Sequence, residues 1–273
     1  MKKRMAISVI VLLVTAATIC GYFFMREYTT AQEEISEYTN IQSQYTTIIN
    51  APSAEPSVDT PTSEAEDTLE ELPLYIEPDF EALLLINPDT VGWIAIPDSV
   101  ISYPVVQATN NAKYLNTSFE GSRSNVGTLF ADKGNDMQSL DPNTIVYGHN
   151  MGTGRTDMFS SLLLYKEYEY YMTHRYIQFD TIYERHGFWK IFAVIELDLS
   201  KTNFICQRMK FQRTADFMEW VSMAMELSIY STVTDIDPQG YILTLSTCDR
   251  SVYGKNGRLI ILAMCCGFDF THS

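Results

Sequence analysis

The sequence predicts a mainly β domain, a closed or nearly closed β-barrel with helical insertions, behind one apolar N-terminal segment. About eight short runs of alternating or β-branched residues, separated by turn residues, predict the strands. One long amphipathic helix interrupts them late in the chain. The 273 residues are 46% hydrophobic and 12% aromatic, which suffices for one good-sized domain with a real core.

The net charge of −15 belongs to one part of the chain. Residues 27–112 carry 16 Asp and Glu and no Lys or Arg, so the other 18 acidic and 19 basic residues nearly balance. The sequence therefore offers no basic face of the kind that binds nucleic acid. We expect no nucleic-acid partner.

The N-terminus predicts a single-pass membrane anchor. Residues 5–25 are 21 uncharged, mostly apolar residues, and as a helix they would span roughly 31 Å. The basic residues of segment 1–4 precede this run, so the positive-inside rule places 1–4 in the cytoplasm and the rest outside. A cleaved signal peptide is the alternative, but the apolar run is long and no A-x-A site follows it.

Residues 26–72 are predicted to be an acidic extracytoplasmic stalk, and residues 73–273 the folded domain. Within the stalk, residues 31–49 carry a weak amphipathic stripe that fits either a helix or a spacer. Residues 50–72 are rich in Pro, Ser, Thr and acid, and as a disordered coil they would span roughly 25–30 Å.

The elements of the folded domain follow from periodicity and from turn residues. Helices are expected at 78–86, which ends before Asn87-Pro88, at 157–170, and at 214–230, where six apolar residues share one face. A short helical or loop element is expected at 111–115. The expected strands are 92–96, 101–106, 128–131, 144–147, 176–180, 188–196, 241–247 and 259–264.

One of the five cysteines stands out as a nucleophile. The strand at 241–247 ends in Ser246 and Thr247 and delivers Cys248 to its edge. A thiol at a strand end is held by rigid backbone yet is reachable from outside. Cys206, Cys265 and Cys266 are interpreted as small packing residues, and whether any of them forms a disulfide stays open.

Two further strand ends carry groups that can assist a thiol. His149 follows Tyr147-Gly148, and an imidazole has the pKa that a general base or acid needs. Arg258 opens the last strand; it stays protonated, so it can orient a carbonyl and stabilise an oxyanion. The alternative is that all three are ordinary barrel residues.

The motifs around these residues resemble those of sortases. The resemblance rests on Thr244-Leu-Ser-Thr-Cys248, on Arg258, and on the upstream Tyr147-Gly-His-Asn150, and it spans about residues 74–264. The segments 86–97 and 147–165, and the long helix before the cysteine strand, are similar to class B sortases. This implies an eight-stranded sortase-type β-barrel with an N-terminal helix and a membrane-anchored cysteine transpeptidase.

The resemblance also implies a reaction. Cys248 would attack the Thr carbonyl of a C-terminal sorting signal, of the Asn-Pro-x-Thr-x or Leu-Pro-x-Thr-Gly kind, on another exported protein. His149 would move the protons and Arg258 would hold the oxyanion. An amine of a peptidoglycan precursor, or a pilin lysine, would resolve the acyl-thioester at the surface of a Gram-positive type envelope. A thiol hydrolase, or a catalytically idle tethered binding module, would be the alternatives.

The substrate groove is inferred from the same resemblance. Asn111 and Leu115 would lie near the backbone and apolar side chain of the signal. Around the cysteine would lie Tyr147, Ser246, Thr247 and Asp249. For Leu115 and Tyr147 a core-packing role is equally open, and Asp249 can be a solvated side chain. Asp132 and Asp136 could suggest a calcium site, but nothing in the sequence requires a metal or cofactor.

Overall fold

The structure is a computed structural model that describes residues 2–49, 73–152, 154–232 and 236–267. It divides into two compact units, Met1–Ile41 and Gln42–Ser273. The first unit belongs to helix α1 (Lys2–Tyr45), and within the described residues this is the one helix long and apolar enough to cross a membrane, judged by length and composition. The stalk segment 50–72 lies outside the described residues.

The stripe at 31–49 is helical up to Tyr45, where α1 ends. Strand β1 (Thr46–Ile49) follows at once and pairs antiparallel with β2 (Tyr75–Pro78), with Ile49 opposite Tyr75. The sequence analysis contains neither strand. Each is only four residues long and its partner lies across residues 50–72, so no local pattern indicates the pairing.

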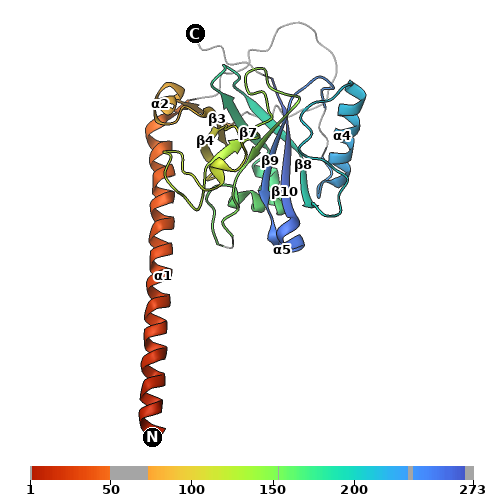
Figure 1. Ribbon diagram of the computed structural model, residues 1–273. Coiled ribbons are helices and arrows are strands. Elements are labelled where there is room, and N and C mark those ends of the chain that lie inside the picture. Colours follow the sequence, from red (N-terminus) through yellow and green to blue (C-terminus); the bar gives the residue numbers. More distant parts are fainter. Residues whose placement is uncertain (1, 50–72, 153, 233–235, 268–273) are drawn as a thin grey trace, which may run out of the picture. The chain divides into compact units, whose positions relative to one another are not determined.

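Eight strands of the second unit close into a barrel, which confirms the expected fold class (Figure 1). Their order is β10-β8-β7-β3-β4-β5-β6-β9. Neighbouring strands are antiparallel except for the parallel pairs β4–β5 and β6–β9. The strands are β3 (Thr90–Ala95), β4 (Ser102–Val106), β5 (Leu129–Ala131), β6 (Asn143–Tyr147), β7 (Tyr176–Thr181), β8 (Phe188–Asp198), β9 (Ile242–Cys248) and β10 (Gly257–Cys265).

Short helices connect the strands. Helix α2 (Phe80–Ile86) begins at Asp79, whose carboxylate accepts a hydrogen bond from the Ala82 amide, and ends at Asn87 as predicted. The helix expected at 157–170 is instead a pair, because Glu167 is extended at φ −94° and ψ 122°. The remaining helices are the 3-10 helices η1 (Lys113–Leu115), η2 (Ser160–Lys166) and η3 (Gly254–Asn256), and the α-helices α3 (Tyr168–Thr173), α4 (Thr214–Leu227) and α5 (Arg250–Tyr253).

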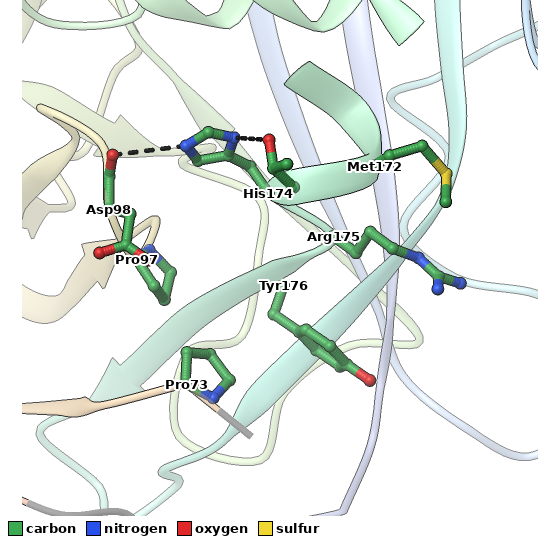
Figure 2. Close-up of a pocket in the computed structure, with 8 residues that line it drawn as sticks. Pro73, Pro97, Asp98, Met172, His174, Arg175 and Tyr176 are labelled. Carbon is green, nitrogen blue, oxygen red and sulfur yellow. Dashed lines mark hydrogen bonds between the residues drawn. The ribbon is translucent and has the colours of Figure 1, made fainter. Parts of the chain in front are cut away.

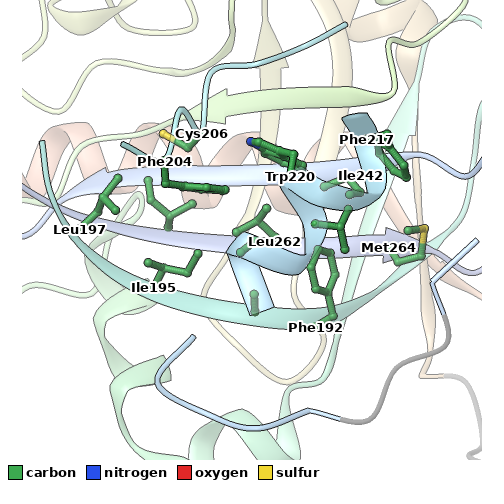
Figure 3. Packing of buried hydrophobic residues seen from close by; sticks show 14 residues of the cluster. Phe192, Ile195, Leu197, Phe204, Cys206, Phe217, Trp220, Ile242, Leu262 and Met264 are labelled. Atoms are coloured by element: carbon green, nitrogen blue, oxygen red, sulfur yellow. The ribbon is translucent and has the colours of Figure 1, made fainter. Parts of the chain in front are cut away.

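Helix α4 lies between β8 and β9 in the chain, as expected, and covers the outer face of the barrel there. Its buried residues pack on side chains of β8, β9 and β10 such as Phe192, Ile242 and Leu262 (Figure 3). These strands are therefore buried on both faces, which explains why β8 and β10 are almost continuously apolar. The strand that ends in Cys248 is held by packing on both sides.

Candidate active site

Strands β9 and β10 place Cys248 opposite Arg258. Cys248 is the last residue of β9, and the antiparallel register pairs it directly with Arg258 near the start of β10. Residues directly opposite each other project from the same face, with Cβ atoms about 4.5–5.5 Å apart. Both residues are half-buried, between buried neighbours in their strands. The thiol and the guanidinium therefore share one face at one end of the barrel.

His149 is carried to the same place by β6, which runs parallel to β9 with Tyr147 opposite Ser246. The residues on either side of His149 are tied to the end of β9. The Thr247 hydroxyl donates to the Gly148 carbonyl at 2.8 Å, and the Asn150 amide donates to the Cys248 carbonyl at 2.7 Å. The structure thus brings His149, Cys248 and Arg258 together from three separate parts of the sequence.

Gly148 is required by space. A Cβ there would lie 2.3 Å from Cδ2 of Leu129 and 2.7 Å from the Phe159 ring, so a side chain would force these buried groups or the end of β6 to move. The close approach of these neighbouring side chains therefore explains why a glycine stands before His149.

The imidazole of His149 is oriented by backbone. Its Nε2 lies 2.8 Å from the Leu115 carbonyl oxygen, at the end of η1. Because a carbonyl only accepts, Nε2 carries a proton in this arrangement. Leu115, expected beside the substrate, thus contributes its carbonyl group to holding the candidate acid–base.

The guanidinium of Arg258 rests on the loop between β9 and β10. Nη1 donates to the Gly257 carbonyl at 2.8 Å and to the Lys255 carbonyl at 3.2 Å. Arginine has five N–H donors in a planar fork, so these two bonds leave most of the fork for an incoming carbonyl or oxyanion.

The thiols of the domain differ in exposure: Cys206 is buried, Cys248 and Cys265 are half-buried, and Cys266 is exposed. All five cysteines are free, so the structure contains no disulfide between Cys206, Cys265 and Cys266. Burial raises the pKa of Cys206 and of Cys265 to about 11, which makes both poor nucleophiles at neutral pH. Cys206 belongs to the cluster under α4, as a packing residue would (Figure 3).

Asn111 and Tyr147 share one carboxylate. Asn111 Nδ2 and the Tyr147 hydroxyl donate to the same Asp132 oxygen at 2.8 and 2.9 Å. Burial, and then Asp132, raise the pKa of Tyr147, so its phenol stays protonated. The sequence analysis set Asp132 aside as a false metal ligand, and among the described residues no three His, Cys, Asp or Glu side chains form a metal-binding group.

The remaining groove residues are buried, and two of them are fully engaged. Ser246 is 5% exposed and Thr247 2%, and the Thr247 hydroxyl is used on Gly148. Asp249, also 2% exposed, begins α5 by accepting hydrogen bonds from the backbone and side chain of Ser251. These contacts support positioning roles for Thr247 and Asp249.

Lys166 is a site residue that the sequence analysis missed. Its Nζ lies 2.9 Å from Asp249 Oδ2 and 2.5 Å from Glu196 Oε1. Burial alone would raise the pKa of Asp249, but hydrogen bonds from Ser251 and Lys166 outweigh it and lower that pKa. Lys166 thereby joins η2, which follows the His149 loop, to the residue after Cys248.

A cavity of about 400 Å³ lies elsewhere, among residues that include Pro73, Pro97, His174 and Tyr176 (Figure 2). In it His174 Nε2 lies 3.3 Å from the Asp98 carbonyl, and Nδ1 is 2.9 Å from the Thr173 hydroxyl. None of the three candidate catalytic residues lines it, so it is not the candidate active site.

A family model described as the sortase domain matches residues 94–265 of the chain. The chain belongs to the sortase family. It is 28% identical over 261 residues to Sortase B of Staphylococcus aureus, covering 96% of both chains. A crystal structure of sortase B from Bacillus anthracis in complex with AAEK1 superposes with a TM-score of 0.68 at 28% identity, over 87% of this chain and 98% of that one. A Staphylococcus aureus sortase B–substrate complex gives 0.63 at 30% identity, over 70% and 86%.

These relatives confirm the class B resemblance and the assignment of this sortase as a cysteine transpeptidase. The expected helix before the cysteine strand is α4, and the expected N-terminal helix is α1. The relatives thus establish the reaction class.

Proposed function

We propose that this sortase uses Cys248 as nucleophile, His149 as proton donor and acceptor, and Arg258 as the oxyanion and carbonyl ligand. The observation that carries the proposal is the register of β9 and β10, which sets Cys248 opposite Arg258, together with the two hydrogen bonds that tie the His149 loop to the end of β9.

The first half of the reaction forms a thioester. The Cys248 thiol passes its proton to His149 as its sulfur attacks the Thr carbonyl of the sorting signal, and the resulting oxyanion is stabilised by donors such as those of Arg258. The C–N bond then breaks, and His149 protonates the departing amine. In the second half an acceptor amine attacks the thioester carbonyl, His149 removes its proton, and the thiol is released.

The substrates proposed are exported proteins with a sorting signal of the Asn-Pro-x-Thr-x or Leu-Pro-x-Thr-Gly kind. The acceptor proposed is an amine of a peptidoglycan precursor. Complexes of sortase B with a substrate and with triglycine are known for relatives, which supports a peptide donor and an amine acceptor. The groove is proposed to include Asn111, Leu115, Tyr147 and Ser246.

The membrane arrangement proposed is a single span at residues 5–25, with residues 1–4 in the cytoplasm and the catalytic domain outside. It rests on the basic residues before the apolar run and on the length of α1. Protease added to intact cells should remove the domain if this is correct, whereas a protected domain would contradict it.

Intact-mass spectrometry tests the chemistry. The full-length chain in detergent is mixed with peptides that contain each kind of sorting signal, and we expect an acyl adduct that Cys248→Ala abolishes and Cys265→Ala retains. Transfer of the acyl group to added amines identifies a transpeptidase, transfer to a pilin lysine identifies a polymerising enzyme, and release to water alone identifies a hydrolase. A mass unchanged with every peptide would favour a binding module and overturn the proposal.

A further inference from the structure

The turn after β8 and the connection between β9 and β10 form one exposed surface at the end of the barrel that carries the candidate active site. Helices α5 and η3 make up that connection, and α5 projects beyond the ends of β9 and β10 (Figure 1). The Leu199 amide donates to the Asn256 carbonyl at 3.1 Å, which joins the turn to the connection. Residues 199–201 and 250–256 are together called the end patch.

Three large apolar side chains of the end patch are exposed to solvent. Leu199 is 40% exposed, Val252 54% and Tyr253 40%. Every residue from Arg250 to Lys255 is exposed as well. Exposed apolar side chains that share one surface, rimmed by polar residues, are typical of a contact with another protein or with a membrane.

The charges of the end patch are all positive. Lys201, Arg250 and Lys255 lie in it, and neither of its two segments contains Asp or Glu. The acidic residues that flank the segments are shielded, because the side chain of Asp198 is 13% exposed and that of Asp249 is 2% exposed. In a chain with a net charge of −15, the patch is thus a local basic surface that attracts an anionic partner.

The combination of cations and apolar side chains favours an anionic lipid bilayer over a soluble polyanion. Each basic residue near an anionic lipid surface strengthens binding about fivefold. Leucine, valine and tyrosine side chains can enter the boundary between headgroups and acyl chains, where tyrosine is enriched, whereas a soluble polyanion offers them no apolar phase.

The chain itself supplies a bilayer within reach. The span proposed at residues 5–25 is followed by residues 26–41 of α1, which as a helix extend only about 24 Å before the second unit begins. A tether of this length raises the effective concentration of the bilayer around the domain, so that even a weak surface contact is populated.

We propose that the end patch docks the catalytic domain on an anionic lipid bilayer. Val252 and Tyr253 insert among the headgroups, while Lys201, Arg250 and Lys255 contact lipid phosphates. The inference goes beyond the proposed catalytic chemistry, and it rests on the proposed membrane span.

Docking through the end patch would hold the candidate catalytic residues at the lipid surface. Cys248 ends β9 just before the patch begins, and Arg258 Nη1 donates to the Lys255 carbonyl at 3.2 Å. A substrate that is itself attached to the membrane would then reach the thiol without leaving that surface.

A tryptophan placed in the end patch tests the proposal. The native tryptophans, Trp93, Trp189 and Trp220, are at most 3% exposed, so Tyr253→Trp adds an emitter outside the core. The full-length chain is reconstituted into vesicles with brominated acyl chains, made of phosphatidylcholine with or without phosphatidylglycerol. We expect strong quenching with phosphatidylglycerol, and little without it or in 1 M salt, where the Debye length is about 3 Å.

The matched control is Tyr183→Trp. Tyr183 is also 40% exposed, but it lies in the turn before β8, at the opposite end of that strand from the end patch. Bromine should quench this variant several-fold less. Adding Arg250→Gln to Tyr253→Trp should lower the ratio of docked to undocked domain about fivefold, and adding Val252→Ser should lower it too, while thioester formation with a soluble peptide in detergent stays unchanged.

The outcomes separate docking from the proposed span. Equal quenching of the two tryptophan variants, or quenching that ignores lipid charge and salt, would overturn the docking. Emission that changes with protein density but not with bromine would identify a second copy of the chain as the partner, and would overturn it too. A chain that fails to float with the vesicles contradicts the span, whereas a chain that floats without quenching contradicts the docking alone.

Discussion

Replacing Lys166 by methionine should destabilise the domain measurably. Lys166 is the cation between Glu196 and the almost fully buried Asp249, and their side chains are 25%, 26% and 2% exposed, respectively. The change keeps most of the aliphatic stem and removes only the charge. Asp249 would then be left as a buried carboxylate with the donors of Ser251 alone.

The structure limits the size of the effect. Removing one partner of a fully buried ion pair costs about 3–5 kcal/mol, but two of these three side chains are about a quarter exposed, so solvent screening reduces the cost to about 2 kcal/mol. For a domain of this size that loss lowers Tm by about 4–8 °C. Thermal unfolding of the full-length chain in detergent, followed by circular dichroism, measures it.

The pH dependence of the stability lost in Lys166→Met shows whether the ion pairs of Lys166 cause that loss. The pKa of Asp249 is lowered in the folded state, so its stabilisation is present above the unfolded value of 3.8 and is lost as the pH falls through the folded value. Burial alone would lower the pKa of Lys166, but Glu196 and Asp249 raise it, so its contribution is present below 10.5 and is lost as the pH rises through the folded value. The Lys166→Met deficit should therefore be full near pH 7 and shrink below about pH 4.

The control is Lys201→Met, because Lys201 is 79% exposed and lies 3.5 Å from Asp198. Such a pair is worth about 0–1 kcal/mol, so its loss should change Tm by little. Equal losses in the two variants, or a Lys166→Met deficit that persists unchanged at about pH 3, would refute the reasoning.

Three further substitutions test the site. Gly148→Ala should lower both Tm and turnover, because its Cβ would lie 2.3 Å from Leu129; an unchanged Tm would contradict the close packing. Asn143→Leu should cost about 2–4 kcal/mol in a denaturant titration, since the Cys206 carbonyl, the partly buried Arg208 carbonyl and the Thr244 hydroxyl lose their partner; a cost near zero would show that they find others. Arg258→Ala should slow thioester formation about 10²–10³-fold in single-turnover mass spectrometry while Tm stays unchanged, and a normal rate would remove Arg258 from the mechanism.

The barrel could be predicted because its strands have local signatures. Most strands are bounded by turn residues, and β8 and β10 stand out as apolar runs because α4 covers their outer face. The β1–β2 pair could not be predicted, since neither four-residue segment has a pattern that identifies its distant partner. The break at Glu167 was missed for a different reason, because the apolar residues keep a helical spacing across it.

In the candidate site, too, some residues could be predicted from the sequence and others could not. Cys248, His149 and Arg258 have chemistry that is visible in their residue types and in their places at strand ends. The role of Lys166 is not visible in the sequence, because a lysine after an apolar run is usually solvated. Its two carboxylate partners come from β8 and from the turn after β9. Asn150 stood inside a recognised motif, yet its bond to the Cys248 carbonyl joins residues 98 positions apart. Contacts of this range become visible only when the strands are paired.

The candidate catalytic residues are positioned by main-chain contacts, and this determines whether their variants should lose activity or stability. Cys248 and Arg258 are brought together by the backbone ladder of β9 and β10, and His149 by bonds from Thr247 and Asn150 to main-chain carbonyls. None of these bonds uses the sulfur of Cys248 or the ring of His149. Substitutions of the two side chains should therefore leave the strand register intact, so that a loss of chemistry can be read separately from a loss of fold. Gly148 is the exception, because there the backbone itself needs the space that a side chain would fill.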